Sequence, residues 1–418
     1  MNEAHQRSIL ALGLLLFYSV QLNAQFSMPS EEAPHEGTWL QWPHNYTYGA
    51  GAEDVEASWV AMTKALSPDE RVHIVAYNAA AISHIETLLN EAEVDLAQVD
   101  FHICETDDFW VRDNGPIFVQ NEEGNLVILD WGFNGWGDDA PFDSDDVVPA
   151  NLGALLNTTV IDLNAVVLEG GAIEVDGQGT LMATRSSITG EDRNPDLTEA
   201  EIESYLETYL GVSQIIWLDG HYGGEEDITD LHIDGFVKFA NNNVLVTMND
   251  ADLDYWYVNS DDRAIIDSAV NLAGIPYTRI NLPLTQNPVY TTSGQNVGFR
   301  SSYVNYYVAN GVVLVPEYAD PMDSVALEII QSLYPSKTAV GINCQNMVLW
   351  GGMVHCVTQQ QPAGSLALTM DQLNLEESQK SKAQLYDLMG REIRETTSGK
   401  VYLKRYENGE VKKFSRQK

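Results

Sequence analysis

Short apolar runs alternate with segments of helical periodicity along most of this 418-residue chain. Runs of four to six mainly apolar residues predict strands, and apolar residues spaced three or four apart predict amphipathic helices. The predicted strands cover residues 72–77, 126–131, 180–184, 214–218, 243–248 and 312–315, and the predicted helices cover 55–66, 79–91, 198–209 and 323–333. Thr198 and Glu201 have the spacing of a capping box. Because strands and helices interleave throughout, the class is α/β or α+β.

The first 24 residues differ from the rest of the chain. Arg7 gives a weakly basic start, residues 9–20 are almost wholly apolar, and Ala24 offers a small residue for cleavage before Gln25. This pattern is typical of a secretion signal peptide and is too short to cross a bilayer, although a buried N-terminal helix is the alternative. We therefore expect a secreted or cell-surface protein, and no later segment is apolar enough to predict a transmembrane helix.

Charge divides the chain into a body and a tail. The last 39 residues hold 11 basic and 5 acidic residues, whereas the remaining 379 hold 11 basic and 56 acidic ones, which gives net charges of +6 and −45. An acidic body repels nucleic acid and attracts small cations, although a solvated acidic surface explains the bulk of the charge equally well. We assign residues 25–362 to one domain, 363–379 to a linker and 380–418 to a separate module.

The three cysteines are Cys104, Cys344 and Cys356. An odd number in an exported chain leaves at least one free thiol, and a Cys104–Cys344 disulfide is one possibility. The chain contains no C-x-x-C pair, so neither a zinc knuckle nor a thioredoxin-type redox site is indicated.

Two segments carry acids in unusual surroundings. Trp110, Arg112 and Asp113 precede a Gly-Pro turn, and an acid beside aromatic rings can hold a planar cation. Glu169 is followed by two glycines, which permit close approach of the backbone. Taken alone, each segment is more typical of a structural role, namely an internal ion pair and a tight turn. Asn134 lies in a third segment, a glycine-rich aromatic loop that could wall a pocket or simply pack on the surface.

His232 and Asp234 are separated by one residue, so on a strand both would point to the same face. Three interpretations compete: a general base with a cation-binding acid, a pair of metal ligands, and a structural histidine. A motif such as HExxH that would add metal ligands is absent, which weakens the second.

Cys356 follows Gly351 and Gly352 and precedes three glutamines. A thiol attacks only as thiolate and therefore needs a nearby cation, whereas a lone cysteine is more often a small buried hydrophobe. His355 is adjacent, but neighbours on a strand face opposite sides, so we do not expect it to serve as the base. Together, a thiol, a histidine and several dispersed acids match what hydrolysis of a guanidinium group requires, because carboxylates must hold the planar cation while a thiolate attacks its central carbon.

These motifs resemble the agmatine deiminase / Porphyromonas-type peptidylarginine deiminase family over residues 28–362. The likeness rests on the W-x-R-D, E-G-G, H-x-D and H-C-x-T-Q-Q-Q-P segments, which are specific only in combination. It implies the pentein fold, an α/β propeller of five ββαβ-type units around a central active site. It also implies that Cys356 is the nucleophile, that His232 is the general acid/base and that Glu169 orients His232. By the same resemblance Asp113 and Asp234 bind the guanidinium, and the pocket is lined by Trp110, Asn134 and Asn305. No metal or cofactor is implied.

Two features of the sequence bear on the identity of the substrate. Trp350 and Met353 stand where many agmatine deiminases have a glycine and a small or amide residue, so they could reshape the pocket. Residues 131–150 contain no Lys or Arg to bind a carboxylate, which favours amine-ended agmatine, although Arg300 or Lys238 could serve instead. Peptidyl-arginine is the alternative substrate. An inactive pentein acting as a surface binding protein and a metal-dependent hydrolase are the competing classes.

The tail resembles a C-terminal sorting domain of type IX secretion. The likeness rests on an L-Y-D-L-M-G-R-E-I run and a later G-K-V-Y-L run, and the Pro-Asn-Pro segment usual upstream is absent. It implies a partner in the outer-membrane secretion machinery. Two short strands around turns fit the pattern, and a basic disordered tail is the alternative.

Overall fold

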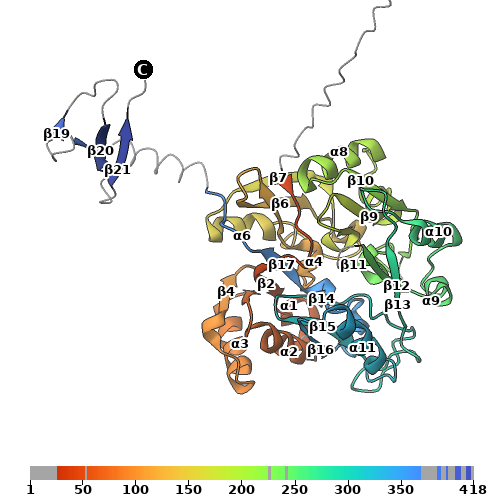
Figure 1. Ribbon diagram of the computed structural model, residues 1–418. Helices are drawn as coiled ribbons and strands as arrows, with labels where there is room; N and C mark the ends of the chain where they lie inside the picture. The colour runs from red at the N-terminus through yellow and green to blue at the C-terminus, as the bar shows by residue number, and fades with distance from the viewer. Residues whose placement is uncertain are drawn as a thin grey trace, which may run out of the picture.

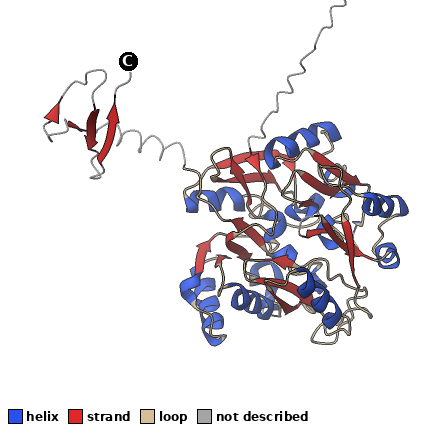
Figure 2. Cartoon of the chain, in the orientation of Figure 1, coloured by secondary structure: helices blue, strands red, loops and turns tan. Residues whose placement is uncertain are grey.

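The computed structural model describes residues 26–51, 54–224, 227–240 and 243–368, and four short strands nearer the C-terminus (Figure 1). The predicted signal peptide and residues 369–379 of the linker lie outside the described residues. Within the described body, strands gather toward the middle and helices lie mainly toward the outside (Figure 2).

The predicted elements are present. Two strands, β9 (Thr180–Thr184) and β10 (Gln214–Leu218), and two helices, α3 (Ala79–Glu91) and α11 (Asp323–Leu333), have the predicted bounds. The others differ by one or two residues: β3 (Arg71–Ala76), β6 (Leu126–Gly132), β12 (Val244–Met248), β15 (Val312–Glu317), α2 (Glu56–Leu66) and α8 (Glu199–Leu210). The capping box of Thr198 and Glu201 at α8 is confirmed.

The body contains five mixed sheets of the same design. In each, an antiparallel pair is followed by a strand that pairs in parallel: β5–β6–β7, β8–β9–β10, β11–β12–β13, β14–β15–β16 and β17–β2–β3, with β1 and β4 added at two edges. The remaining strands are β1 (Phe26–Ser27), β2 (His35–Gln41), β4 (Val99–Ile103), β5 (Ile117–Asn121), β7 (Val160–Val167), β8 (Ile173–Val175), β11 (Lys238–Ala240), β13 (Thr278–Leu282), β14 (Tyr307–Val308), β16 (Thr338–Asn343) and β17 (Gln359–Pro362).

Helices connect the parallel strands of these sheets. For example, α2 and α3 surround β3, and α11 lies between β15 and β16 in sequence. The other helices are α1 (Asn45–Tyr48), α4 (Val111–Asn114), α5 (Gly135–Asp138), α6 (Val148–Leu156), α7 (Arg185–Ile188), α9 (Asp250–Tyr255) and α10 (Ser260–Ser268). Among the described residues, no helix is long and apolar enough to cross a membrane.

The two ends of the body are joined in one sheet. β17 pairs antiparallel with β2, with Gln359 opposite Trp39, and Trp39 Nε1 donates to Gln361 Oε1 at 3.0 Å. Strand pairing that links residues more than 300 positions apart fixes the segment that precedes β17. That segment contains Cys356.

The tail strands form one antiparallel sheet in the order β19–β18–β20–β21. They are β18 (Gln384–Tyr386), β19 (Glu392–Ile393), β20 (Val401–Arg405) and β21 (Val411–Ser415). The two runs that the sequence singled out therefore belong to a sheet of four strands rather than two.

Candidate active site

The E-G-G segment lies at the centre of the site. Gly170 and Gly171 are in the short 3-10 helix η3 (Gly170–Ala172) directly after Glu169. A β-carbon added at Gly171 would lie 2.6 Å from His232 Nδ1, 2.7 Å from Asp113 Oδ1 and 3.3 Å from Asp234 Oδ2. Three of the predicted site residues thus converge on this glycine, and any larger residue would displace them.

Asp113 is held by neutral donors on both oxygens. It lies on α4, where its Oδ1 accepts from the backbone N–H of Gly171 at 3.0 Å and its Oδ2 accepts from Trp136 Nε1 at 3.0 Å. Burial, with further contributions from Asp234 and Glu169, raises the pKa of Asp113 to about 6, against the lowering effect of His232. A bound cation would therefore strongly favour the ionised form of Asp113.

His232 lies between carboxylates. Its Nε2 is 3.3 Å from Glu169 Oε2, and its Nδ1 is 3.7 Å from Asp113 Oδ1. Burial alone lowers the pKa of His232, but Asp113, Glu169 and Asp234 outweigh it and raise the pKa to about 9. Glu169 is itself fixed, since its Oε1 accepts from Arg193 Nε at 2.6 Å and both side chains are fully buried. His232 is thus an oriented imidazolium near neutral pH.

The segment 232–234 is not a strand. His232 precedes the 3-10 helix η5 (Ile233–Gly235), which contains Asp234. The two side chains still reach the same centre because both lie beside Gly171. Its apolar neighbours fix the segment, since Ile233 and Phe236 are fully buried in the core.

Cys356 also lies in a 3-10 helix, η7 (His355–Val357), and not on a strand. Its Sγ is 3.4 Å from Asn305 Nδ2 and 3.9 Å from Asp234 Oδ2. Burial, with Asp234 and Asp113 nearby, raises the pKa of the Cys356 thiol well above its ordinary value. The unliganded site thus keeps a neutral thiol, and a cation bound between the carboxylates would favour the thiolate.

The three glutamines after Cys356 each bind a different element. Gln359 Nε2 donates to the carbonyl of Pro116, Gln360 Oε1 accepts from Arg112 Nη1 at 3.0 Å, and Gln361 binds Trp39. Since all three are buried, these bonds hold η7 against α4 and β2.

The predicted pocket-lining residues differ in their positions. Asn305 contacts Cys356 Sγ, and its Nδ2 also donates to the carbonyl of Asp234 at 3.3 Å. Trp110 packs so closely on Gly352 that a β-carbon there would overlap its ring. Asn134, in contrast, binds the carbonyl of Asp192 and the N–H of Gly137, so it shapes the loop and does not reach the centre.

Three residues that the sequence reasoning missed as site residues complete the site. Trp136 donates to Asp113, Arg193 holds Glu169, and His355 donates to Asp234 from Nδ1 at 2.8 Å. The sequence contains one indication of the role of Arg193. Only 11 Lys and Arg residues precede the tail, and a buried cation among them needs a carboxylate partner. Trp136 has φ 57° between two glycines, a conformation that turns its ring inward.

Neither basic residue proposed to bind a substrate carboxylate is directed at the centre. Lys238 is buried and its Nζ binds Glu31 Oε2 at 3.0 Å. Arg300 donates to the carbonyl of Thr285 at 2.6 Å and lies 3.1 Å from Asp252. Both guanidinium and ammonium groups are thus engaged by other partners. Trp350 lies against Gly51, and Met353 belongs to the largest buried core cluster.

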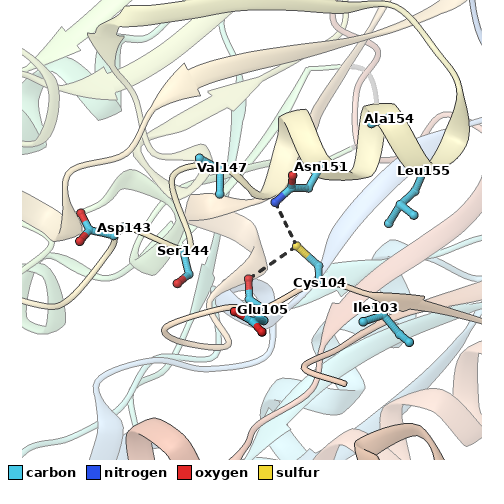
Figure 3. A pocket seen from close by; sticks show the side chains of 9 residues that line it. All are labelled: Ile103, Cys104, Glu105, Asp143, Ser144, Val147, Asn151, Ala154 and Leu155. Atoms are coloured by element: carbon cyan, nitrogen blue, oxygen red, sulfur yellow. Dashed lines mark hydrogen bonds between the residues drawn. The ribbon is translucent and has the colours of Figure 1, made fainter. Parts of the chain in front are cut away.

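The Cys104–Cys344 disulfide, which the sequence left open, is not formed, and both residues are free thiols. Cys344 is fully buried in the largest core cluster. Cys104 lies beside a separate surface hollow of about 670 Å³, where its sulfur faces Asn151 Nδ2 and the carbonyl of Glu105, each at 3.6 Å (Figure 3). Burial raises the pKa of both thiols, so each is a structural residue.

Within the described part of the chain, no group of three or more His, Cys, Asp or Glu side chains is arranged to hold a metal ion. The site carries a thiol, the imidazolium of His232 and carboxylates that a planar cation can bridge. These are the groups that a cysteine-dependent guanidine hydrolase requires.

The chain belongs to the Porphyromonas-type peptidyl-arginine deiminase family, whose model matches residues 27–362. Among its relatives, it is 32% identical over 362 residues to an agmatine deiminase of Pseudomonas aeruginosa and 33% identical over 365 residues to one of Pseudomonas savastanoi. Each match covers 81% of this chain and 96% of the relative. The solved agmatine deiminase of Enterococcus faecalis superimposes with a TM-score of 0.72 at 29% identity, covering 81% of this chain and 96% of that one.

Proposed function

We propose that this protein hydrolyses the guanidinium group of agmatine to give N-carbamoylputrescine and ammonia. The observation that carries the proposal is the convergence of Asp113, His232 and Asp234 on Gly171, with Cys356 Sγ 3.9 Å from Asp234. Membership of the family and the similarity to named agmatine deiminases support it.

The mechanism follows from the charges. Asp113 and Asp234 clamp the guanidinium, and its positive charge stabilises the Cys356 thiolate as the thiol proton leaves to solvent. The thiolate adds to the central carbon. His232 then protonates one amino group, which departs as ammonia and leaves a cationic thiouronium on Cys356. The neutral His232 takes a proton from water, and hydroxide adds to the same carbon. As the C–S bond breaks, the hydroxyl proton passes to the departing sulfur, which gives the neutral ureido product and restores the thiol.

The roles of the surrounding residues are part of the proposal. Glu169 orients His232 and keeps it protonated, and Asn305 lies beside the nucleophile. Trp110 forms a wall behind Gly352. The five mixed sheets would form the five ββαβ-type units of a pentein propeller, with these residues at its middle. The shared antiparallel-then-parallel strand design supports this arrangement.

Peptidyl-arginine is the second candidate substrate, because the matching family model is named for that activity and the predicted signal peptide would expose the enzyme to extracellular proteins. The engagement of Lys238 and Arg300 elsewhere disfavours recognition of a free substrate carboxylate and is compatible with either agmatine or an internal peptide arginine. We also propose that the protein is exported and that the basic tail addresses it to the type IX secretion machinery.

The test is ammonia release by the purified full-length protein from agmatine, free arginine and an arginine-containing peptide in parallel. Cys356→Ala is the matched control, and it should lose turnover while keeping its fold. Release from agmatine alone supports the proposal, and release from the peptide moves the assignment to protein deimination. A folded protein that is silent on all three would be a binding protein, and an active Cys356→Ala variant would contradict the mechanism.

A further inference from the structure

A series of buried charged side chains connects Asp234 to the first residues of the body. His355 is 2% exposed, and both of its ring nitrogens face carboxylate oxygens: Nδ1 lies 2.8 Å from Asp234 Oδ2 and Nε2 lies 2.7 Å from Glu31 Oε2. A carboxylate can only accept here, so both nitrogens donate and the ring is an imidazolium. This cation sits between two anions that are 203 positions apart in sequence.

Glu31 lies at the other end of this series and accepts several hydrogen bonds. Its Oε1 accepts from the backbone N–H of Val308 at 2.7 Å, and its Oε2 receives Lys238 Nζ at 3.0 Å in addition to His355. Arg112 Nη2 lies 3.6 Å away. Although burial opposes ionisation, Lys238, His355 and Arg112 hold the pKa of Glu31 well below its usual range. Glu31 is therefore a fixed anion that accepts a hydrogen bond from the outer nitrogen of His355.

We infer that His355 is a positioning residue, which holds the Asp234 carboxylate ionised and in place for the guanidinium, while Glu31 fixes the ring from its opposite side. The inference rests on the proposed function. It differs from the assignment of His232, because His355 touches neither the substrate carbon nor the leaving group and acts only through Asp234. Its backbone is fixed as well, with its N–H donating to Asn305 Oδ1 at 3.0 Å and its carbonyl accepting from Arg112 Nε at 3.3 Å.

The charged groups around Asp234 show why the imidazolium of His355 matters. His355, His232 and Arg112 favour its ionised form, while burial and the neighbouring carboxylate of Asp113 oppose it. Together they lower the pKa of Asp234, with His355 as the largest of the lowering influences. Loss of a cation in direct contact with a buried carboxylate raises the pKa by about 1–3 units. The pKa of Asp234 would then rise toward that of Asp113.

The decisive variant is His355→Gln, read through the pH dependence of kcat/KM for agmatine. In the wild type, only Asp113 titrates on the acidic side, near pH 6. In the variant the pKa of Asp234 rises, so the acidic limb should move upward and steepen toward two protons. A merely structural role would lower the rate at every pH without moving the limb. An unmoved limb in a folded, active variant overturns the inference.

His35→Gln is the matched control. His35 is another buried histidine beside the same segment, with Nε2 2.8 Å from the carbonyl of Glu31 and Nδ1 3.6 Å from Glu70, but it is not in contact with Asp234. It should leave the acidic limb in place. Glu31→Gln is a milder second variant, because it keeps the bond between His355 and Asp234 and removes only the outer anion. It should move the limb in the same direction by less, and no movement in this variant contradicts the role of Glu31.

A binding measurement separates this inference from the proposed function. Calorimetry of agmatine binding to Cys356→Ala and to Cys356→Ala/His355→Gln, in buffers of different ionisation enthalpy, counts the protons released on binding. The double variant should release more protons on the acidic side of the profile, up to about one per site, because bound guanidinium displaces the proton of Asp234. Equal proton counts overturn the inference alone. Wild-type protein that binds agmatine without turnover overturns the proposed function alone, and protein that does not bind agmatine overturns both.

Discussion

At the scale of residues, the site separates its titrating groups by environment. Asp113 has neutral donors on both oxygens and a pKa raised to about 6, whereas His232 is flanked by carboxylates and has a pKa raised to about 9. These two pKa values lie on either side of neutral pH. The proposed chemistry needs Asp113 ionised and His232 protonated, which is the state that both groups have near pH 7.

The pH profile should therefore be bell-shaped. Binding of the cation is lost as the pH falls through about 6, because Asp113 takes up a proton, and donation to the leaving amine is lost as the pH rises through about 9, because His232 gives up its proton. Glu169→Gln removes a group that raises the pKa of His232, so the basic limb of kcat/KM should move to lower pH. A basic limb that stays in place in this variant would assign it to another group.

Gly171 offers a test of the geometry. Replacement by Ala puts a β-carbon within 2.6–2.7 Å of His232 Nδ1 and Asp113 Oδ1, closer than real β-carbons approach other atoms. We expect kcat/KM for agmatine to fall by about 100-fold or more, since small displacements of catalytic groups are costly. Gly124→Ala is a control for handling, because nothing lies near its β-carbon position, although its φ of 77° adds local strain. Near-normal kinetics of Gly171→Ala would refute the central position of this residue.

At the scale of elements, short irregular helices rather than strands carry the chemistry. Asp113, Asp234 and Cys356 lie on α4, η5 and η7, and Gly171 lies on η3. Regular elements fix these pieces from outside: Phe109, just before α4, packs edge-on against Trp59 of α2 with ring centroids 4.9 Å apart. Such a pair adds about 0.5–1.5 kcal/mol beyond the burial of its area. The short helices place side chains, and the sheets and long helices keep them in place.

The loop that leads into α5 contributes to the site through the indole of Trp136. Trp136→Phe keeps an aromatic ring but removes the donor to Asp113 Oδ2, so the pKa of Asp113 should rise and the acidic limb of kcat/KM should move upward. Loss of a hydrogen bond to a charged group costs about 1.5–3 kcal/mol, which corresponds to roughly 10- to 100-fold in kcat/KM.

Trp131→Phe is the matched control for this change. Trp131 is as buried as Trp136, at 4% exposure, and its Nε1 has no hydrogen-bond partner among the described residues. Both substitutions remove the same volume, so both should lower Tm to a similar degree, but only Trp136→Phe should alter the pH profile. Equal kinetic effects of the two variants would reduce the role of Trp136 to packing.

At the scale of the whole molecule, charge is the dominant feature. The first 379 residues carry a net charge of −45, and several of their few cations are buried next to the site. A negative surface raises the local concentration of a cationic substrate, and salt screens that effect over about 10 Å at 0.1 M.

We expect kcat/KM for agmatine to fall several-fold between about 10 mM and 500 mM NaCl, with kcat nearly constant, because screening weakens encounter and leaves the bound complex unchanged. Steady-state kinetics at fixed pH would measure this. The same series in an equally concentrated neutral osmolyte is the control. If kcat/KM does not change with salt, the acidic surface serves solvation and not substrate capture.

The sequence alone determined the local elements and the identity of most chemical groups. Periodicity reflects contacts between residues two to four positions apart, so it located helices such as α3 and strands such as β9 with their observed bounds. The motifs that resemble the deiminase family supplied Cys356, His232, Asp113, Glu169 and Asp234, and the structure brings these residues together. Asn134 was placed too close to the centre, because membership of a loop does not say which way a side chain points.

Only the tertiary structure decided the partners of those groups. His355 meets Asp234 across 121 positions and Glu31 across 324, and Glu169 meets His232 across 63. No local pattern records such pairings, because they depend on how the sheets assemble and on β17 returning to β2. For the same reason the sequence left a Cys104–Cys344 bond open and could not give His355 a role. Buried charges must find partners wherever the fold places them, and only the assembled fold shows which ones they meet.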